Sequence, residues 1–277
     1  MPASTTYAPP SASIGVFGGS GFYDFLPDVR EVIVDTPYGA PSDLVAIASV
    51  GNHRVAFLPR HGRGHTHPAH AVNYRANVWA LHSLGVRQII APCAVGSLQK
   101  HIHPGDFVVL DQIFDRTTQR ADTFFNGPIT HHISAADPYC QRMRAIALAT
   151  AQELGIAVHE NGTAVIIQGP RFSTKAESAW YTGNGWSVVG MTQYPEAILA
   201  KELGICYSGI ALVTDYDAGL VAETGEAVSV EAVLKTMADN NHRVQALIVA
   251  MLERLPAAVD GACQCAKEAD WAVMNGR

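Results

Sequence analysis

The chain has 277 residues and a formal net charge of −6 at pH 7, and 48% of its residues are hydrophobic. This length predicts a sizeable core, and the acidic balance argues against general binding to nucleic acids or to anionic membranes. No apolar run is long enough to span a bilayer, and residues 1–13 lack the basic start and apolar block of a signal peptide, so we expect a disordered leader there.

The five cysteines are an odd number in a chain with no recognisable signal peptide. This pattern predicts a cytoplasmic protein with mostly reduced thiols. The pair Cys263-Gln-Cys265 lies in a polar stretch near the C-terminus. A redox pair and half of a metal site are both open interpretations, but we expect two solvent-side thiols without a role.

The first predicted strand runs from Ser13 into the glycine turn Gly18-Gly-Ser-Gly21. Backbone N–H groups in such a turn can converge on an anion, and Ser20 adds a hydroxyl. The spacing matches neither a dinucleotide fingerprint nor a P-loop. A tight turn without a ligand is the alternative.

A hairpin is predicted around Gly51-Asn52, between strands at 45–50 and 54–58. The second strand leads into Arg60 and His61. A fixed cation and a histidine beside a glycine at a strand end suit a phosphate or a carboxylate.

Three further histidines follow closely, at His65, His67 and His70. Such a cluster invites a metal interpretation, as in some hydrolases, but no acidic residue lies among them to complete a typical ligand set. We therefore expect a polar loop rather than a metal site.

A helix is predicted from Pro68 to Gly85, and then a buried strand over 86–94 that runs into the turn Cys93-Ala-Val-Gly-Ser97. A short strand is expected at 108–110. Residues 115–137 have no clear period, and long irregular segments of this kind are usually functional or at an interface.

The next elements alternate between helices and strands. A helix is predicted over 141–154 and a strand over 162–168, and Thr174-Lys-Ala-Glu177 is a capping box that opens another helix. A short strand at 188–192 precedes a helix that begins at Pro195 and ends at Gly204.

The apolar run Ile205–Val213 carries no charge, which is typical of a strand buried on both faces. Asp215 and Asp217 follow it, and in an extended chain two such residues point to the same side. Open α/β sheets place their chemistry beyond the carboxyl ends of strands. An aspartate that only caps a turn is the alternative.

A last long helix is predicted after Ser229. The alternation of strands and helices predicts one α/β domain over residues 14–255, with a mixed, largely parallel central sheet flanked by helices, followed by a C-terminal tail over 256–277.

These strand ends together supply an anion site and a pair of carboxylates. Glycine N–H groups, an arginine and hydroxyls suit the anion, and the carboxylates suit proton transfer. Such a pair of sites suggests attack by phosphate on a substrate whose leaving group needs a proton.

Several ordered motifs between Ile14 and Leu255 resemble the trimeric purine nucleoside phosphorylase family, and within it the 5'-methylthioadenosine phosphorylase branch. They are Gly18-Gly-Ser-Gly21, Leu58-Pro-Arg-His-Gly62, Val72-Asn-Tyr-Arg-Ala-Asn77, Cys93-Ala-Val-Gly-Ser97, Asp111-Gln112 with Asp115-Arg-Thr-Thr118, Gln168-Gly-Pro-Arg-Phe172, Met191-Thr192 with Pro195-Glu196, and Thr214-Asp-Tyr-Asp217.

The resemblance implies a role for each matching residue. Phosphate would be bound by Ser20, Arg60, His61, Cys93, Ala94 and Thr192, although Cys93 stands where many relatives have threonine. The nucleoside would be bound by Phe172 over the base, Met191 against the ribose, Asp215 and Asp217 at the purine, Val230 at the 5' substituent, and His132 from a neighbouring subunit.

The substrate implied is S-methyl-5'-thioadenosine, cleaved by phosphate to adenine and 5-methylthioribose 1-phosphate. Asp215 would donate the proton at purine N7, and an aspartate there suits a 6-amino group where relatives that prefer 6-oxopurines carry asparagine. Val230 is apolar and suits a methylthio group. Gln193 and Tyr194 differ from the smaller or apolar residues of relatives and would alter the sugar pocket.

The family is a homotrimer without metal or organic cofactor, so the resemblance implies small-molecule partners only, a nucleoside and phosphate. Alternatives are a phosphorylase for purine nucleosides or 5'-methylthioinosine, a nucleosidase that uses water, a metal-dependent hydrolase built on the three histidines, and a purine-binding protein without activity. The Cys263-Gln-Cys265 pair is similar to a motif of archaeal relatives that use disulfides.

Overall fold

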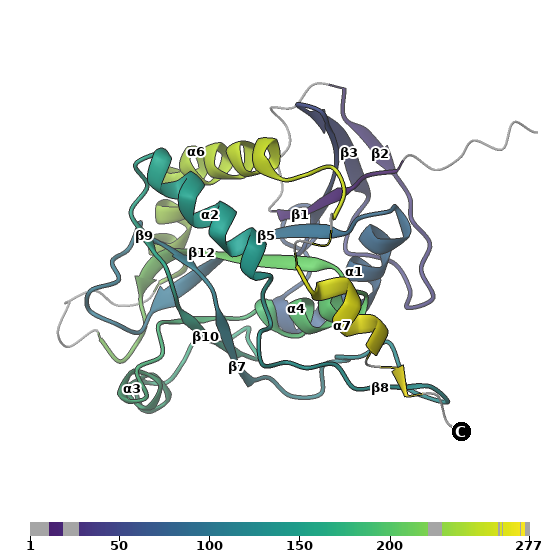
Figure 1. The fold of residues 1–277 in the computed structure, drawn as a ribbon. Coiled ribbons are helices and arrows are strands. Elements are labelled where there is room, and N and C mark those ends of the chain that lie inside the picture. Colours follow the sequence, from purple (N-terminus) through teal and green to yellow (C-terminus); the bar gives the residue numbers. More distant parts are fainter. Residues whose placement is uncertain are drawn as a thin grey trace, which may run out of the picture.

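The computed structural model describes residues 11–18, 28–220, 229–259, 261, 263–271 and 273–274. The described chain forms one α/β domain around an eleven-stranded mixed sheet, as the sequence predicts (Figure 1). A separate two-stranded ladder joins β8 (Thr130–His131) to β13 (Val273–Met274). Nothing is described of the expected leader before residue 11.

The main sheet has a path of eight strands with a branch. The path runs in the order β2 (Arg30–Val32), β3 (Val45–Val50), β4 (His53–Pro59), β1 (Ile14–Gly18), β5 (Gln88–Ser97), β11 (Val188–Gly190), β10 (Thr163–Ile167) and β7 (Gln112–Arg116). The branch consists of β12 (Cys206–Tyr216), which pairs with β5, then β6 (Phe107–Val109) and β9 (Val158–His159).

Strand β5 is the centre of this arrangement because it has three partners. It pairs in parallel with β1 through Ile90, in parallel with β12 along its whole length, and antiparallel with β11 from Gly96. Between Ile90 and Gly96, neither β1 nor β11 is registered against β5. On the side of β5 that faces away from β12, residues 91–95 therefore have no partner strand, and we call this stretch the open edge of β5.

Helices cover both faces of the sheet (Figure 1). On one face, α2 (Gln141–Glu153) and α6 (Val230–Arg254) pack against each other and against β12, and on the other, α1 (Tyr74–Ser83) packs against α4 (Gln193–Glu202). Helix α3 (Lys175–Gly183) begins with the predicted capping box, in which Thr174 and Glu177 satisfy each other's backbone N–H groups.

The predicted helix after Pro68 begins later than expected. Pro68 opens only a single turn of 3-10 helix, η1 (Ala69–Ala71), and Val72 returns to an extended conformation. The α-helix starts at Tyr74 because the Asn73 side chain accepts a hydrogen bond from the Ala76 N–H group at 3.2 Å.

The C-terminal segment folds back onto the domain. Helix α7 (Cys265–Trp271) packs against α4, and Lys201 of α4 forms an ion pair with Glu268 at 2.6 Å. A Cβ atom on Gly204 would lie 3.1 Å from Ala266 Cα, so the two backbones approach closely here. The expectation that Cys263 and Cys265 face solvent is wrong, because both are partly buried against the core.

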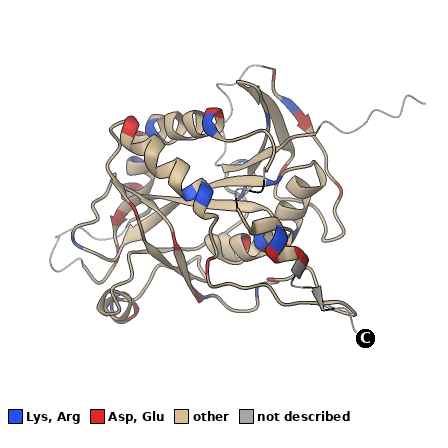
Figure 2. Ribbon diagram, viewed as in Figure 1, with Lys and Arg blue, Asp and Glu red and all other residues tan. Residues whose placement is uncertain are grey.

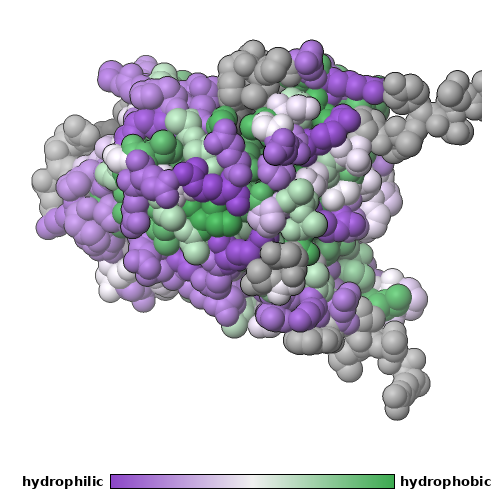
Figure 3. All heavy atoms as spheres, turned by 45° about the horizontal axis from the view of Figure 1, so that its top comes forward, coloured by the Kyte–Doolittle hydropathy of each residue, from purple (hydrophilic) through white to green (hydrophobic). Residues whose placement is uncertain are grey.

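Charge and hydropathy are distributed differently over the molecule. Acidic and basic residues are scattered and do not separate into two sides (Figure 2). Seen with the top of Figure 1 turned forward, hydrophobic residues gather in the middle of the face, between hydrophilic margins (Figure 3). Among the described helices, none is both long and apolar enough to cross a membrane.

Candidate active site

The open edge of β5 carries the first group of predicted site residues. Pro92, Cys93 and Ala94 are partly exposed, although the rest of this strand is buried. Because no neighbouring strand is registered with this edge here, the side chains and backbone groups of these residues can face a ligand.

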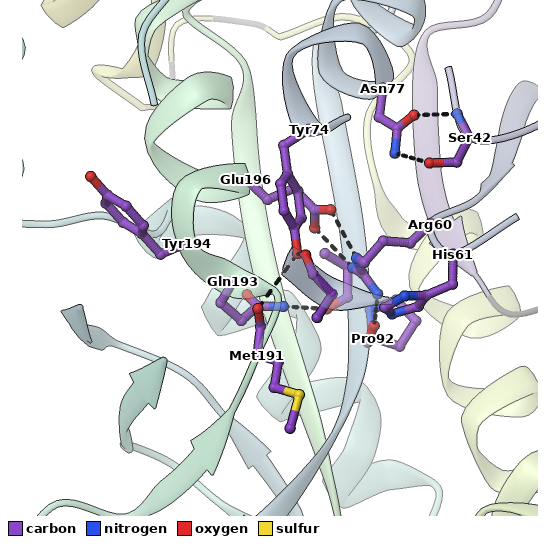
Figure 4. A network of polar contacts seen from close by, with 12 residues as sticks. Ser42, Arg60, His61, Tyr74, Asn77, Pro92, Met191, Gln193, Tyr194 and Glu196 are labelled. Carbon is purple, nitrogen blue, oxygen red and sulfur yellow. Dashed lines mark hydrogen bonds and ion pairs between the residues drawn. The ribbon is translucent and has the colours of Figure 1, made fainter. Parts of the chain in front are cut away.

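Arg60 reaches this edge from the end of β4. Its Nη1 donates to the Pro92 carbonyl at 3.0 Å, while Nε and Nη2 each donate to the Glu196 carboxylate at 2.8 Å (Figure 4). A guanidinium has five N–H groups, so two remain for an anion. Glu196 and Arg60 are both buried, which fixes the cation in one orientation.

His61 is held in one tautomer beside Arg60 (Figure 4). Its Nδ1 lies 2.9 Å from the His67 carbonyl oxygen and therefore donates its proton there. Burial and the neighbouring Arg60 lower the pKa of His61 to about 4. The ring is thus neutral at pH 7, and Nε2 carries a lone pair that can accept the O–H group of hydrogen phosphate.

The first turn of α4 packs under the same edge. Thr192, the residue before α4, is buried, and the Gln193 amide lies 3.4 Å from the Ala91 carbonyl oxygen. Helix α4 is irregular at Tyr194 and becomes regular at Pro195, the start that the sequence predicts. Burial raises the pKa of the nearby Cys93 thiol to about 12, so this thiol is protonated at neutral pH.

Gln193 and Tyr194 directly follow the predicted site residue Thr192, and their side chains point in different directions. Gln193 is buried under β12, where a Cβ atom on Gly209 would come within 2.3 Å of its Oε1. Tyr194 points away from Arg60, and its hydroxyl donates to Asp122 at 2.5 Å (Figure 4). That both residues alter the sugar pocket stays a prediction from the sequence.

Asp215 and Asp217 lie together over Gly96, at the far end of the open edge. A β-bulge between Val213 and Asp215 shifts the register, so that Asp215 pairs with Gly96. A Cβ atom on Gly96 would lie 3.1 Å from Asp215 Oδ1 and 3.5 Å from Asp217 Cβ. The two aspartates share one side, as their spacing predicts, and glycine leaves room for both.

The environment of the two carboxyl groups favours their neutral forms. Burial raises the pKa of Asp215 to about 6 and the neighbouring Asp217 adds to the shift, while a 2.8 Å hydrogen bond from the Thr214 hydroxyl opposes it. Burial also raises the pKa of Asp217, against a hydrogen bond from Ser178. Among the described residues, Asp217 Oδ2 is buried without a hydrogen-bond partner, so its capacity to accept a hydrogen bond is unused.

Arg120 holds the backbone beside Met191 in place, a role that the sequence analysis did not assign to it. Its guanidinium donates to the carbonyl oxygens of Met191 at 2.8 Å, Tyr194 at 2.5 Å and Gln168 at 2.9 Å. It also lies 5.2 Å from the centre of the Tyr74 ring. Its position in the irregular segment 115–137 was the available signal, because such a segment is usually functional.

Met191 lies beside the glycine turn that leads to Phe172. A Cβ atom on Gly169, which has a φ of +68°, would come within 2.7 Å of Met191 Sδ, so only glycine fits here. Phe172 is 39% exposed at the end of this turn. The turn brings the residue expected over the base close to the residue expected against the ribose.

Two further predicted residues, Val230 and His132, have no contact with this group among the described residues. Val230 begins α6 and is 60% exposed. His132 is exposed next to β8, whose His131 Nε2 lies 2.6 Å from the Ala269 carbonyl oxygen of α7. Ser20 lies outside the described residues.

The histidine cluster does not assemble into a set of ligands. His65 stacks on His61 with ring centres 4.2 Å apart, and His67 uses its backbone carbonyl to hold His61. In the described part of the chain, the one group of three or more potential ligands that converges consists of cysteines instead. This arrangement argues against the metal-dependent hydrolase alternative and for the predicted polar loop.

Comparisons with known proteins agree with this geometry. Residues 13–253 match the family model of the phosphorylase superfamily. A purine nucleoside phosphorylase of Streptomyces coelicolor is 52% identical, covering 92% of this chain and 93% of the relative. An S-methyl-5'-thioadenosine phosphorylase of Saccharolobus solfataricus is 49% identical, with 92% and 94% covered. The crystal structure of a methylthioadenosine phosphorylase from an antarctic soil metagenomic library superposes with a TM-score of 0.89 at 39% identity, covering 95% of this chain and 93% of that one.

Proposed function

Because the chain belongs to the phosphorylase superfamily, we propose that it cleaves S-methyl-5'-thioadenosine with phosphate to give adenine and 5-methylthioribose 1-phosphate. The observation that carries this proposal is one open strand edge with Arg60 fixed at Pro92 and Asp215 fixed at Gly96. Gly96 is four positions along the strand from Pro92, about 13 Å at ~3.3 Å per residue. A phosphate ion and a nucleoside laid in line can fill this span.

Phosphate occupies the Arg60 end in this proposal. The two unused guanidinium N–H groups and Thr192 donate to its oxygens, the backbone at Ala94 faces it, and neutral His61 accepts its remaining proton. The Cys93 thiol, which stays protonated, contributes a weak donor in place of a hydroxyl. Ser20 is assigned here from the resemblance alone.

Asp215 acts at the other end as the general acid. As a phosphate oxygen attacks the anomeric carbon, the bond from that carbon to N9 breaks, and its electron pair passes to the purine. The positive charge that develops on the ribose is stabilised by the phosphate anion. Neutral Asp215 donates its proton to N7, so that neutral adenine leaves, and the proton is then replaced from solvent.

Recognition of the base and sugar involves the rest of the group. The unpartnered Oδ2 of Asp217 is suited to an amino group of the purine, which favours 6-aminopurines. Phe172 covers the base, Met191 contacts the ribose, and Val230 contacts the methylthio group. His132 lies apart from the others, which fits its assignment to a neighbouring subunit's site.

We also propose a homotrimer that needs no organic cofactor and acts in the cytoplasm, in the salvage of purines and methionine. The hydrophobic residues gathered on the face in Figure 3 support association, as do the exposed side chains of Ile129, Phe172 and Leu234. Mass photometry or sedimentation at working concentrations gives the number of subunits directly, and a monomer or dimer would contradict the trimer.

The test of the function is adenine release from S-methyl-5'-thioadenosine, with and without phosphate. We expect phosphate-dependent release, with inosine and 5'-methylthioinosine cleaved more slowly. Release that is independent of phosphate would make the protein a nucleosidase, and binding of adenine without turnover would make it a binding protein.

The second candidate is a purine nucleoside phosphorylase, which the Streptomyces coelicolor relative favours at 52% identity. The same assay separates the two functions. Faster cleavage of inosine than of S-methyl-5'-thioadenosine would establish the second candidate and would require a different interpretation of Asp215 and Val230.

A further inference from the structure

Four of the five cysteines meet at one point, at the end of β12 that is remote from Asp215. The sulfur atoms of Cys140, Cys206, Cys263 and Cys265 all lie within 4.8 Å of one another. The Cys206 and Cys263 sulfurs are 3.2 Å apart, and all four thiols are free. Cys206 begins β12 and Asp215 lies nine residues further, about 30 Å along the strand at ~3.3 Å per residue.

The four sulfurs come from three separate parts of the fold. Cys140 immediately precedes α2, Cys206 begins β12, and Cys263 and Cys265 lie at the turn into α7. Two of these sulfurs are therefore on the body of the domain and two are on the C-terminal segment. A bond or a metal ion that links the four sulfurs therefore also links the C-terminal segment to the sheet.

The spacing of the sulfurs suits one tetrahedral ion. Zinc bound by thiolates has Zn–S distances of about 2.3 Å, which places the sulfurs of a tetrahedral site roughly 3.8 Å apart. The Cys206–Cys263 separation of 3.2 Å is a little below this value, and the 4.8 Å limit that holds for all pairs is above it. Small side-chain rotations are enough to close the group around an ion.

A partly buried cation beside the cluster is the second observation. Arg142 Nη2 lies 3.8 Å from Cys206 Sγ and also donates to the Gln88 amide oxygen at 2.7 Å. Its Nε and Nη1 are buried without a hydrogen-bond partner among the described residues. Four thiolates and Zn²⁺ carry a net charge of −2, which the positive charge of Arg142 partly offsets. Disulfides are neutral and would not be stabilised by this positive charge.

We propose that Cys140, Cys206, Cys263 and Cys265 bind one zinc ion that clips the C-terminal segment onto the start of β12. On binding, the four thiols lose their protons to solvent and the ion accepts four sulfur lone pairs, with no change of oxidation state. The site is structural, because four protein ligands leave no open position. It departs from the expectation that the chain holds no metal.

The zinc content of the full-length protein tests the proposal. The protein is produced in zinc-supplemented medium, purified with a phosphine reductant and desalted, and zinc per chain is measured by mass spectrometry of the elements. We expect about one zinc ion per chain. Cys206→Ser and Cys265→Ser should each lose at least nine-tenths of it, whereas the matched control Cys93→Ser, at the cysteine outside the cluster, should keep it.

A measurement on the unaltered chain covers the case in which a serine variant fails to fold. Saturating the thiols of the native protein with an organomercurial should release one zinc ion to a chromophoric chelator, and Co²⁺ exchanged into the site should show thiolate-to-cobalt charge-transfer absorption. Zinc removal should also expose residues 256–277 to proteolysis while phosphorolysis at room temperature continues, because none of the four cysteines belongs to the proposed active site.

Three results would overturn the proposal. The first is a zinc-free protein with all five thiols free under denaturing conditions, which would make the cluster a packing feature. The second is a protein that, purified without reductant, is zinc-free and has a single free thiol, which would show that the four sulfurs form two disulfides. Retention of zinc by both Cys206→Ser and Cys265→Ser would place the ion elsewhere and overturn the assignment as well.

Discussion

The Arg60 guanidinium donates two parallel hydrogen bonds of 2.8 Å to the Glu196 carboxylate, and both side chains are buried. Glu196 also accepts a 2.6 Å hydrogen bond from Tyr207. The arginine is therefore positioned by α4 and β12 together, before any phosphate arrives.

Removing one charge of this pair should destabilise the fold. In Glu196→Gln the buried Arg60 loses its counterion, and breaking a buried pair in this way costs about 3–5 kcal/mol. Urea denaturation measures the loss of unfolding free energy. The control is Glu153→Gln, which breaks the exposed pair with Arg254 and should cost about 0–1 kcal/mol. Equal effects of the two substitutions would contradict the role given to Glu196.

The pH dependence of the reaction should follow Asp215. Because the donor must be protonated and burial raises the pKa of Asp215 to about 6, kcat/KM should fall as pH rises through about 6. The Thr214 hydroxyl lowers this pKa, so Thr214→Val should move the falling limb to higher pH. A limb that stays in place or moves to lower pH would remove Asp215 as its source.

Asp215→Asn should increase the stability of the protein above pH 6 and decrease its activity. The pKa of Asp215 rises from 3.8 to about 6 on folding, so the folded state holds this proton more tightly and is favoured at low pH. As pH rises from about 4 to about 6 this advantage is lost, and above pH 6 ionisation costs the folded state about 3 kcal/mol at 1.36 kcal/mol per pKa unit.

The asparagine variant avoids that cost. It should be more stable than the unaltered chain above pH 6 and should lose phosphorolysis by at least about 100-fold, the usual effect of removing a general acid. Unfolding curves at pH 5 and pH 8 and assays at both values measure the two effects. Near-normal activity would show that another group protonates the purine.

A methyl group at position 96 should disturb the carboxylates directly. In Gly96→Ala the added Cβ lies 3.1 Å from Asp215 Oδ1 and 3.4 Å from Val189 Cγ1, and overpacking of this kind costs about 1–3 kcal/mol. We expect kcat to fall at least about tenfold, since a misplaced acid transfers its proton poorly. Gly183→Ala is the matched control, because a Cβ there meets nothing within 4 Å.

Arg120 is expected to act on the nucleoside side only. Arg120→Lys cannot hold the Met191, Tyr194 and Gln168 carbonyl groups at once, because an ammonium lacks the planar fork of a guanidinium. The KM for the nucleoside should rise at least about tenfold while the KM for phosphate changes little. Equal increases in both KM values would indicate a general loss of structure instead.

The architecture could be predicted from the sequence because its signals are local. The uncharged run that ends in Asp215 and Asp217 gave a buried strand and two carboxylates on one side, and the structure contains both. The strand extends to Tyr216, beyond the apolar run, because a bulge maintains pairing with β5 where hydrophobicity has ended. Bulges have no composition signal of their own.

What could not be predicted depends on contacts between distant segments. Glu196 lies 136 positions from Arg60, and nothing near either residue indicates the other. The four clustered cysteines are spread from position 140 to position 265, so the sequence offered only the pair Cys263-Gln-Cys265 in a polar stretch. The start of α1 was missed because the capping effect of Asn73 outweighed the helix-starting tendency of Pro68.

Strands β5 and β12 run in parallel register from Gln88 and Cys206 to the bulge beside Asp215. If Ala94 faces the attacking phosphate and Asp215 faces the departing base, the pairing of the two strands fixes the distance between the nucleophile and the leaving group. The sequences of loops such as the Gly169 turn can then change to admit other purines or 5' substituents without altering that distance. A scaffold of this kind lets substrate preference diverge while the bond-breaking step is inherited unchanged.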